Sequence, residues 1–203
     1  MKALLRALAV GFLVVATSGC YFPIRFDAEI ELSRYGSYTI HFDGYMTRLQ
    51  VYDKLRKREM SRAEERAAIE TLKTDVERDS ATQVFEYIRD GIFRLGWQKS
   101  GDLFVNRQVT FLRRNELILE MRYLRDEAEV LIEGKYLSPD NQRRLLDMGL
   151  NTEGQVRVLT DAAVTSHSAN FVADWPEKPG YKMYTWKVEN VTSPSVRMKI
   201  AVR

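Results

Sequence analysis

Cysteine is nearly absent from this sequence of 203 residues, which contains one, Cys20. A single cysteine cannot close a disulfide within the chain, so packing alone must stabilise the fold. Histidine is almost as scarce, since His41 and His167 are the only two and lie far apart in the sequence. Asp161 with His167 would supply two metal ligands, and two ligands do not make a site. The sequence therefore predicts no metal and no other cofactor.

Motifs that carry catalysis are also missing. There is no Gly-x-Ser-x-Gly turn, no phosphate-binding loop and no dinucleotide fingerprint. Ser166 and Ser168 flank His167, but neighbours on a strand point to opposite faces of a sheet. We therefore expect that the protein is not an enzyme. A pocket with convergent polar groups around His41 or His167 would favour the enzyme alternative.

An excess of one charge is absent as well. Lysine and arginine number 31 against 28 acidic residues. Without Lys2 and Arg6, which lie in the segment described next, the balance is 29 to 28. This near-neutrality argues against a nucleic-acid partner. Hydrophobic residues make up 45% of the chain, which is enough to bury one substantial core.

Long hydrophobic runs are limited to residues 7–16, close to the N-terminus. Lys2 and Arg6 precede this run, and small residues follow it at 16–19. The run is too short for a transmembrane helix, which needs about 20 apolar residues. Its length and flanks are typical of a secretory signal. We expect a signal peptide over residues 1–19 and a single domain over residues 20–203.

The small residues before Cys20 resemble the lipobox of bacterial lipoproteins, although Thr17 stands where that motif usually has leucine. The resemblance implies cleavage between Gly19 and Cys20 and acylation of the Cys20 thiol with chains such as palmitate. Two or more acyl chains hold a protein stably on a membrane. Tyr21 in place of aspartate implies the outer membrane, facing the periplasm. The alternative is an ordinary secretory signal with an incidental buried Cys20.

The first part of the domain alternates apolar and charged residues over 25–32 and again over 37–44. This pattern predicts an antiparallel hairpin. No Ser/Gly-rich spacer separates it from Cys20, so the domain should lie close to the membrane.

Residues 45–60 carry apolar side chains at helical spacing, and Ser61 with Glu64 forms a capping-box pattern before a helix over 62–78. We expect two helices, or one helix broken near Ser61. Residues 82–100 fit either a helix or a hairpin over 83–89 and 92–99. We favour the hairpin because Asp90-Gly91 is a strong turn signal.

Further alternation predicts strands over 103–112, 116–123, 127–136, 155–160, 163–168, 181–188 and 196–202. Ser138 and Pro139 predict the start of a short helix that ends before Gly149. The expected fold is α+β, a mostly antiparallel sheet with two or three helices packed on one face.

Several stretches together are similar to a family of proteobacterial envelope lipoproteins and, more distantly, to the LppM-like lipoprotein domain. They are residues 38–44, 111–115, 154–162, 167–170 and 184–188 with Pro194. The resemblance implies a compact domain on a lipid anchor, with lipid or glycolipid binding. It brings no catalytic residue.

Two features are candidates for contact with a membrane or partner. The basic stretch within residues 48–58 could rest on anionic headgroups, or it could be the solvated face of a helix, since Asp53 and Glu59 interrupt it. Trp175, in the loop 174–180, could meet a membrane or protein, or it could cap the edge of the core. The basic candidates are Arg48, Lys54, Arg56, Lys57 and Arg58.

The combined prediction is a non-enzymatic envelope lipoprotein whose domain binds a lipid or a protein near the membrane. The alternative is a structural subunit of a larger envelope assembly, in contact through sheet edges or Trp175.

Overall fold

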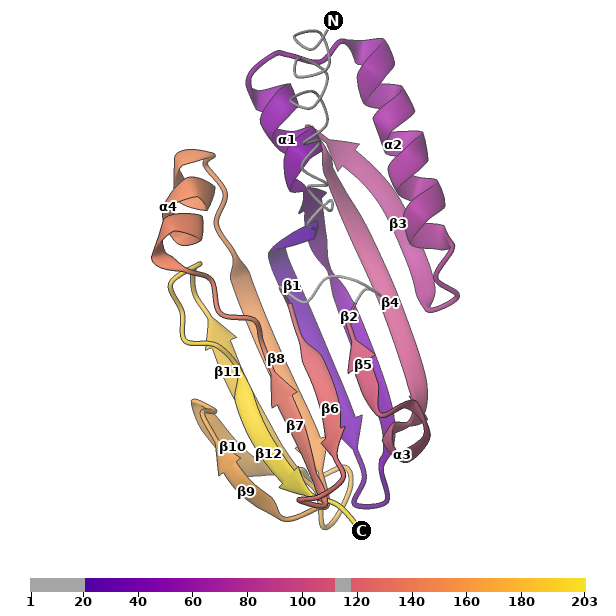
Figure 1. The fold of residues 1–203 in the computed structure, drawn as a ribbon, viewed down its shortest axis with the longest axis vertical. Helices are drawn as coiled ribbons and strands as arrows, with labels where there is room; N and C mark the ends of the chain where they lie inside the picture. Colours follow the sequence, from indigo (N-terminus) through magenta and orange to yellow (C-terminus); the bar gives the residue numbers. More distant parts are fainter. Residues whose placement is uncertain (1–20, 112–117) are drawn as a thin grey trace, which may run out of the picture.

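The computed structural model describes residues 21–111 and 118–203 as two stacked β-sheets, with three of the four described helices at one end (Figure 1). The larger sheet has the order β10-β11-β8-β1-β2-β4-β3, and the smaller has the order β5-β6-β7-β12-β9. All strand pairs are antiparallel except β1 with β8. The α+β prediction with mostly antiparallel sheet is confirmed.

The bounds of the elements are as follows. The larger sheet contains β1 (Tyr21–Leu32), β2 (Ser37–Arg48), β3 (Thr82–Arg89), β4 (Ile92–Asp102), β8 (Glu153–Thr160), β10 (Phe171–Asp174) and β11 (Lys182–Val188). The smaller sheet contains β5 (Gln108–Thr110), β6 (Glu120–Leu124), β7 (Glu129–Glu133), β9 (Val164–His167) and β12 (Arg197–Ala201). The helices are α1 (Leu49–Arg56), α2 (Arg62–Glu77), α3 (Leu103–Asn106) and α4 (Pro139–Asp147).

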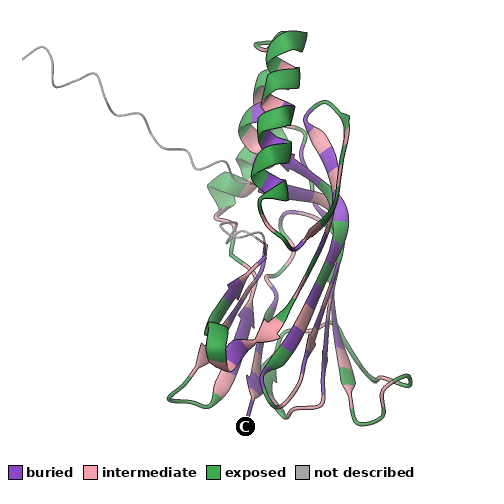
Figure 2. Ribbon diagram, turned by 90° about the vertical axis from the view of Figure 1, so that its right-hand side faces the viewer, coloured by how far each residue is buried: buried purple, intermediate pink, exposed green. Residues whose placement is uncertain are grey.

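The core lies on one face of the larger sheet. The smaller sheet covers part of this face, and α1 and α2 cover the part near the start of β4 (Figures 1 and 2). Helix α2 is exposed except along the stripe of Ile69, Leu72 and Val76 that faces the strands. Phe111 joins the layers, because its ring centroid lies 4.2 Å from that of Phe42 and 5.0 Å from that of Trp97.

Strand β1 is central and has paired neighbours on both sides. Its alternating residues bury Ile30 and Leu32 completely on the core face. Phe26 pairs with Gly44 on β2 and Gly154 on β8. A Cβ atom at Gly154 would lie 2.2 Å from the carbonyl oxygen of Phe26. Glycine is therefore required there to let the two backbones approach.

Residues 82–100 form a hairpin, as predicted. Asp90 and Gly91 have φ angles of 53° and 74°, as a type I′ turn requires. The capping box at Ser61 and Glu64 is present, so two separate helices form. Helix α1 is shorter than the predicted segment, because β2 continues to Arg48 through pairing with both β1 and β4.

Three predicted strands were wrong in extent, and one strand was not predicted. Residues 103–112 are not one strand: Asp102 accepts a hydrogen bond from the Phe104 N–H and begins α3, which leaves only Gln108–Thr110 for β5. Strands β6 and β7 are shorter than predicted, and residues 112–117 lie outside the described part of the chain. Strand β10 was not predicted, because its residues are all exposed and show no alternation of buried positions.

At the end opposite Tyr21, the turn after β1 is held by Asp161 in the turn after β8. Arg34 donates to the Asp161 carboxylate from its backbone N–H at 2.8 Å and from Nε at 2.6 Å. Burial raises the pKa of this carboxyl, but the hydrogen bonds from Arg34 outweigh that effect and leave the pKa below its usual value. The carboxylate therefore stabilises the fold in its ionised form.

Replacement of Asp161 tests whether its ionised carboxylate stabilises the fold. Asp161→Asn should lower the melting temperature near neutral pH. The folded pKa is depressed, so the contribution of Asp161 is complete above its unfolded pKa of about 3.9 and is lost as the pH falls through the folded pKa. The difference between wild type and variant, measured by thermal unfolding monitored by circular dichroism, should shrink in acid. An unchanged difference in acid would contradict this account.

Candidate functional site

A cavity of about 200 Å³ opens at the end of the molecule where β1 begins. Residues from both ends of the chain line it, since β1 contributes Phe22, Pro23 and Phe26 and the last loop contributes the segment before β12. The remaining wall comes from the segments that follow β7 and α4 and from β8 and the end of β11. The apolar lining includes Ile118, Leu137, Val156, Val188, Val191 and Val196.

Helix α4 stabilises one side of this end. Ser138 caps its N-terminus, Pro139 occupies the first turn, and Gly149 ends it with a φ of 72°. The Leu150 N–H then donates to the Leu145 carbonyl at 2.9 Å, as in a Schellman motif. Leu145 and Leu150 are both buried in a small cluster with Phe22 and Val191. The predicted helix signals thus position a wall next to the start of β1.

One polar group beside the cavity lacks a partner. Thr152 lines the cavity and is 8% exposed, and its Oγ1 makes no hydrogen bond. Two other polar groups at the site are satisfied within the protein: Gln142 donates to the Leu137 carbonyl, and the Ser193 hydroxyl accepts from backbone N–H groups. A buried hydroxyl without a partner costs free energy. A bound group that pairs with Thr152 would recover that cost.

The two histidines lie in different sheets. His41 is on the solvated face of β2, and His167 is in β9, where its Nδ1 accepts from the Ala169 N–H. The Ser168 hydroxyl accepts from Trp186 Nε1 and the Arg197 N–H. Within the described residues, no group of three or more His, Cys, Asp or Glu side chains could hold a metal ion.

The outer face of the larger sheet is solvated and rich in paired charges. A shallow groove of about 510 Å³ runs over it beside His41 and Gln98. Arg157 bridges Asp27 and Glu29 at 2.9 Å each, and the hydrogen bond from Arg94 lowers the pKa of Asp43. Each of these arginines is therefore already paired with at least one carboxylate.

The predicted basic stretch lies at the same end as the cavity. Arg48 is the β2 residue opposite Tyr21, the first described residue after Cys20. Lys57 and Arg56 contact Asp53 at 2.7 and 3.4 Å, and the bond from Lys57 is the main cause of the lowered pKa of Asp53. Arg48 Nε is buried and makes no hydrogen bond.

Trp175 lies at the other end of the larger sheet. It is half-buried in the turn between β10 and β11, where its backbone N–H donates to the Tyr181 carbonyl. The strand that follows, β11, begins at Lys182, which pairs with Thr160 at the end of β8. Thr160 pairs in turn with Leu32, the last residue of β1, so this turn lies near the end of β1. A strand of 12 residues spans about 36 Å. The structure therefore separates Trp175 from the basic stretch.

The cavity was not predicted from the sequence. Its walls come from segments more than a hundred residues apart, and no local pattern joins Phe22 to Val196. The only local signal was the helix start at Ser138 and Pro139. Cys20 and Gly19 lie outside the described residues. Among the helices that are described, none is long and apolar enough to cross a membrane.

Comparisons with known proteins give a likeness in structure. Neither the protein-family models nor the curated proteins produced a match. Among solved structures, the NMR structure of the folded domain of Mycobacterium tuberculosis LppM is similar, with a TM-score of 0.44 and 14% identity. The match covers 90% of this chain and 92% of that one. We take no function from a likeness at this level.

The unpaired hydroxyl can be tested by removing it. Thr152→Val should raise the free energy of unfolding by about 1–3 kcal/mol, because the buried unpaired group is lost at constant shape. The matched control is Thr47→Val, since the Thr47 hydroxyl is fully buried and donates to the Gly91 carbonyl at 2.8 Å. That variant should lose about 1–3 kcal/mol. Urea denaturation of both measures the contrast, and an equal loss in both would show that Thr152 is already paired.

Proposed function

We propose that the protein is a non-enzymatic lipoprotein of the bacterial envelope, held through Cys20, whose domain binds the apolar part of a lipid in the cavity beside β1. The proposal includes the outer membrane as its location and the periplasm as the side it faces. The observation that carries it is the apolar cavity with the unpaired Thr152 hydroxyl at the end where β1 begins.

The size of the cavity favours part of an acyl chain over a whole lipid. A volume of about 200 Å³ equals the liquid volume of six or seven waters, at about 30 Å³ each. Each methylene moved from water into such a site contributes about 0.8 kcal/mol. Thr152 could hydrogen-bond an ester or hydroxyl group at one end of that segment. Weak, selective binding of a single chain would follow.

The position of the cavity fits a ligand delivered from a membrane. Phe22 and Pro23 line it, and they follow the predicted acylation site by two and three residues. Neighbouring residues in a strand are about 3.3 Å apart. An anchored Cys20 would thus keep the cavity within reach of the bilayer surface.

A cavity-filling variant tests whether an acyl chain binds in the cavity. Val188 lines the cavity at the half-buried end of β11, so Val188→Trp should occupy it and abolish binding of a fluorescent fatty acid to the full-length protein. Val172→Trp is the matched control, because Val172 lies on the edge strand β10 and is 45% exposed. This control should bind as the wild type does. Absence of binding by the wild type, with no lipid found by native mass spectrometry, would overturn the proposal.

The anchor has its own test. Cys20→Ser should move the protein out of the membrane fraction and abolish metabolic labelling with an acyl precursor, because no thiol remains to be acylated. A protein that stays acylated and membrane-bound after this substitution would contradict the anchor.

A second candidate function is a structural subunit of an envelope assembly. Strands β3 and β10 are the two edges of the larger sheet and expose Val84, Ile88, Phe171 and Val172. Sheet edges can pair with a strand of another chain. Register shifts at both ends of β3 make that edge less regular. A stoichiometric protein partner in the native mass spectra, in place of a lipid, would favour this function.

A further inference from the structure

We infer that the end of the domain formed by α1, α2 and α4 rests on an anionic lipid surface, with Lys54, Arg58 and Arg62 as its main cationic contacts. This inference rests on the proposed anchor at Cys20 and goes beyond the cavity. It assigns an orientation to the domain, which neither the anchor nor the cavity determines.

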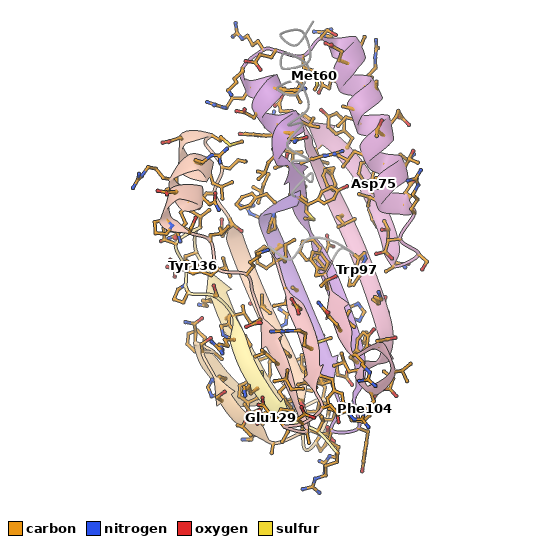
Figure 3. All side chains as sticks on the ribbon, viewed as in Figure 1. Met60, Asp75, Trp97, Phe104, Glu129 and Tyr136 are labelled. Atoms are coloured by element: carbon orange, nitrogen blue, oxygen red, sulfur yellow. The ribbon has the colours of Figure 1, made fainter. Side chains whose placement is uncertain are left out.

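The first contacts of the chain after Cys20 point to this end. Tyr21 pairs with Arg48, the residue that precedes α1, and Phe22 packs in the cluster that contains Leu145 of α4. Leu49 of α1 packs against the same cluster. Figure 1 shows α1, α2 and α4 at the end where β1 begins, while α3 lies at the other end. Met60, labelled in Figure 3, lies at the tip of the helical end.

The excess of positive charge at this end is concentrated in α1 and the start of α2. Residues 48–66 contain seven Lys and Arg side chains against four carboxylates. Three of the carboxylates are engaged within the protein, since Asp53 binds Lys57, Glu64 accepts from the Ser61 N–H, and Glu65 accepts from the Tyr87 hydroxyl. Among the ion pairs of the described residues, none involves Lys54, Arg58 or Arg62. Anionic headgroups match this charge.

Helix α4 adds an exposed apolar side chain and a further cation to this end. Leu146 is 51% exposed. Arg143 on the same helix is 73% exposed. Cations beside exposed apolar groups are typical of surfaces that lie at a membrane interface.

The other surfaces fit an anionic membrane less well. On the outer face of the larger sheet, Arg94 and Arg157 each bind carboxylates, so headgroups would have to compete with existing partners. The end that carries Trp175 lies about 36 Å from Tyr21 along the strands. The helical end is therefore the surface that both the tether and the charge select.

A substitution at Arg58 can remove a cation from the proposed surface without destabilising the fold. It follows the last turn of α1 with a φ of 58°, and the Glu59 N–H donates to the Lys54 carbonyl, as in a Schellman motif. Glycine is favoured at this position because a side chain strains the left-handed conformation. Arg58→Gly should therefore stabilise the fold and at the same time remove one membrane contact.

The chain provides a matched control for this variant. Arg107 is also an exposed arginine after the last turn of a helix, with a φ of 60°. It follows α3, at the end opposite Tyr21. Arg107→Gly removes the same charge and relieves the same kind of strain, but away from the proposed surface.

The experiment uses the full-length acylated protein in vesicles that contain phosphatidylglycerol. Because Cys20 is the only cysteine and its thiol carries the proposed anchor, a fluorophore can be placed on Ala63→Cys, at the exposed start of α2 three residues after Met60, or on Trp175→Cys. A nitroxide on the lipid headgroups should quench the label at 63 and leave the label at 175 bright. Quenching at 63 should fall in phosphatidylcholine vesicles and in 1 M salt, where the Debye length is about 3 Å.

The two glycine variants then decide the inference. Arg58→Gly should raise the melting temperature and reduce the ratio of docked to undocked domain about fivefold, as expected for one cation at an anionic surface. Arg107→Gly should raise the melting temperature without changing the quenching. Equal quenching at 63 and 175, or equal effects of both variants, would overturn the inference.

Flotation of the vesicles distinguishes failure of the anchor from failure of the orientation. A protein that does not float with the vesicles lacks the anchor, and the orientation falls with it. A protein that floats while the label at 63 stays bright keeps its anchor and loses only the orientation. Binding of the fatty acid in the cavity is measured separately and does not depend on either result.

Discussion

The rest of the structure depends on the close approach of three backbones at the start of β1. Phe26 lies between Gly44 on β2 and Gly154 on β8, where a Cβ atom at Gly154 would collide with the Phe26 carbonyl. Because β1 is paired on both sides from this point, its inner face carries the core and its outer face carries the ion pairs of Arg157. Its first residues also form a wall of the cavity.

The two ends of the molecule differ in how their polar groups are satisfied. At the end with Arg34 and Asp161, backbone and side-chain groups are paired across two turns. At the opposite end, Thr152 Oγ1 is buried and unpaired beside an open cavity, and several cations have no acidic partner among the described residues. Unmet hydrogen-bonding capacity and uncompensated charge both favour binding. This difference is the physical basis for placing ligand and membrane at the same end.

Local signals predicted a large part of the fold. Alternation identified the hairpin of β1 and β2, Asp90-Gly91 identified that of β3 and β4, and the caps at Ser61 and Ser138 identified α2 and α4. Each of these depends on contacts within a few residues. The break at 103–106 was missed because Asp102 caps a single turn of helix, and the pairing of Tyr123 with the Arg107 carbonyl holds the chain after it. Strand β10 exists through its pairing with β11.

The sequence by itself determined the alternating faces of the strands, the starts and ends of two helices, and the prediction of a lipid anchor at Cys20. These follow from residues that are neighbours in the chain. Only the tertiary structure decided that Phe22 and Val196 share a cavity, that Thr152 has no partner, and that the basic stretch and Trp175 lie at opposite ends. Those facts depend on which strands pair and in what register, and strand pairing brings together residues that no local pattern connects.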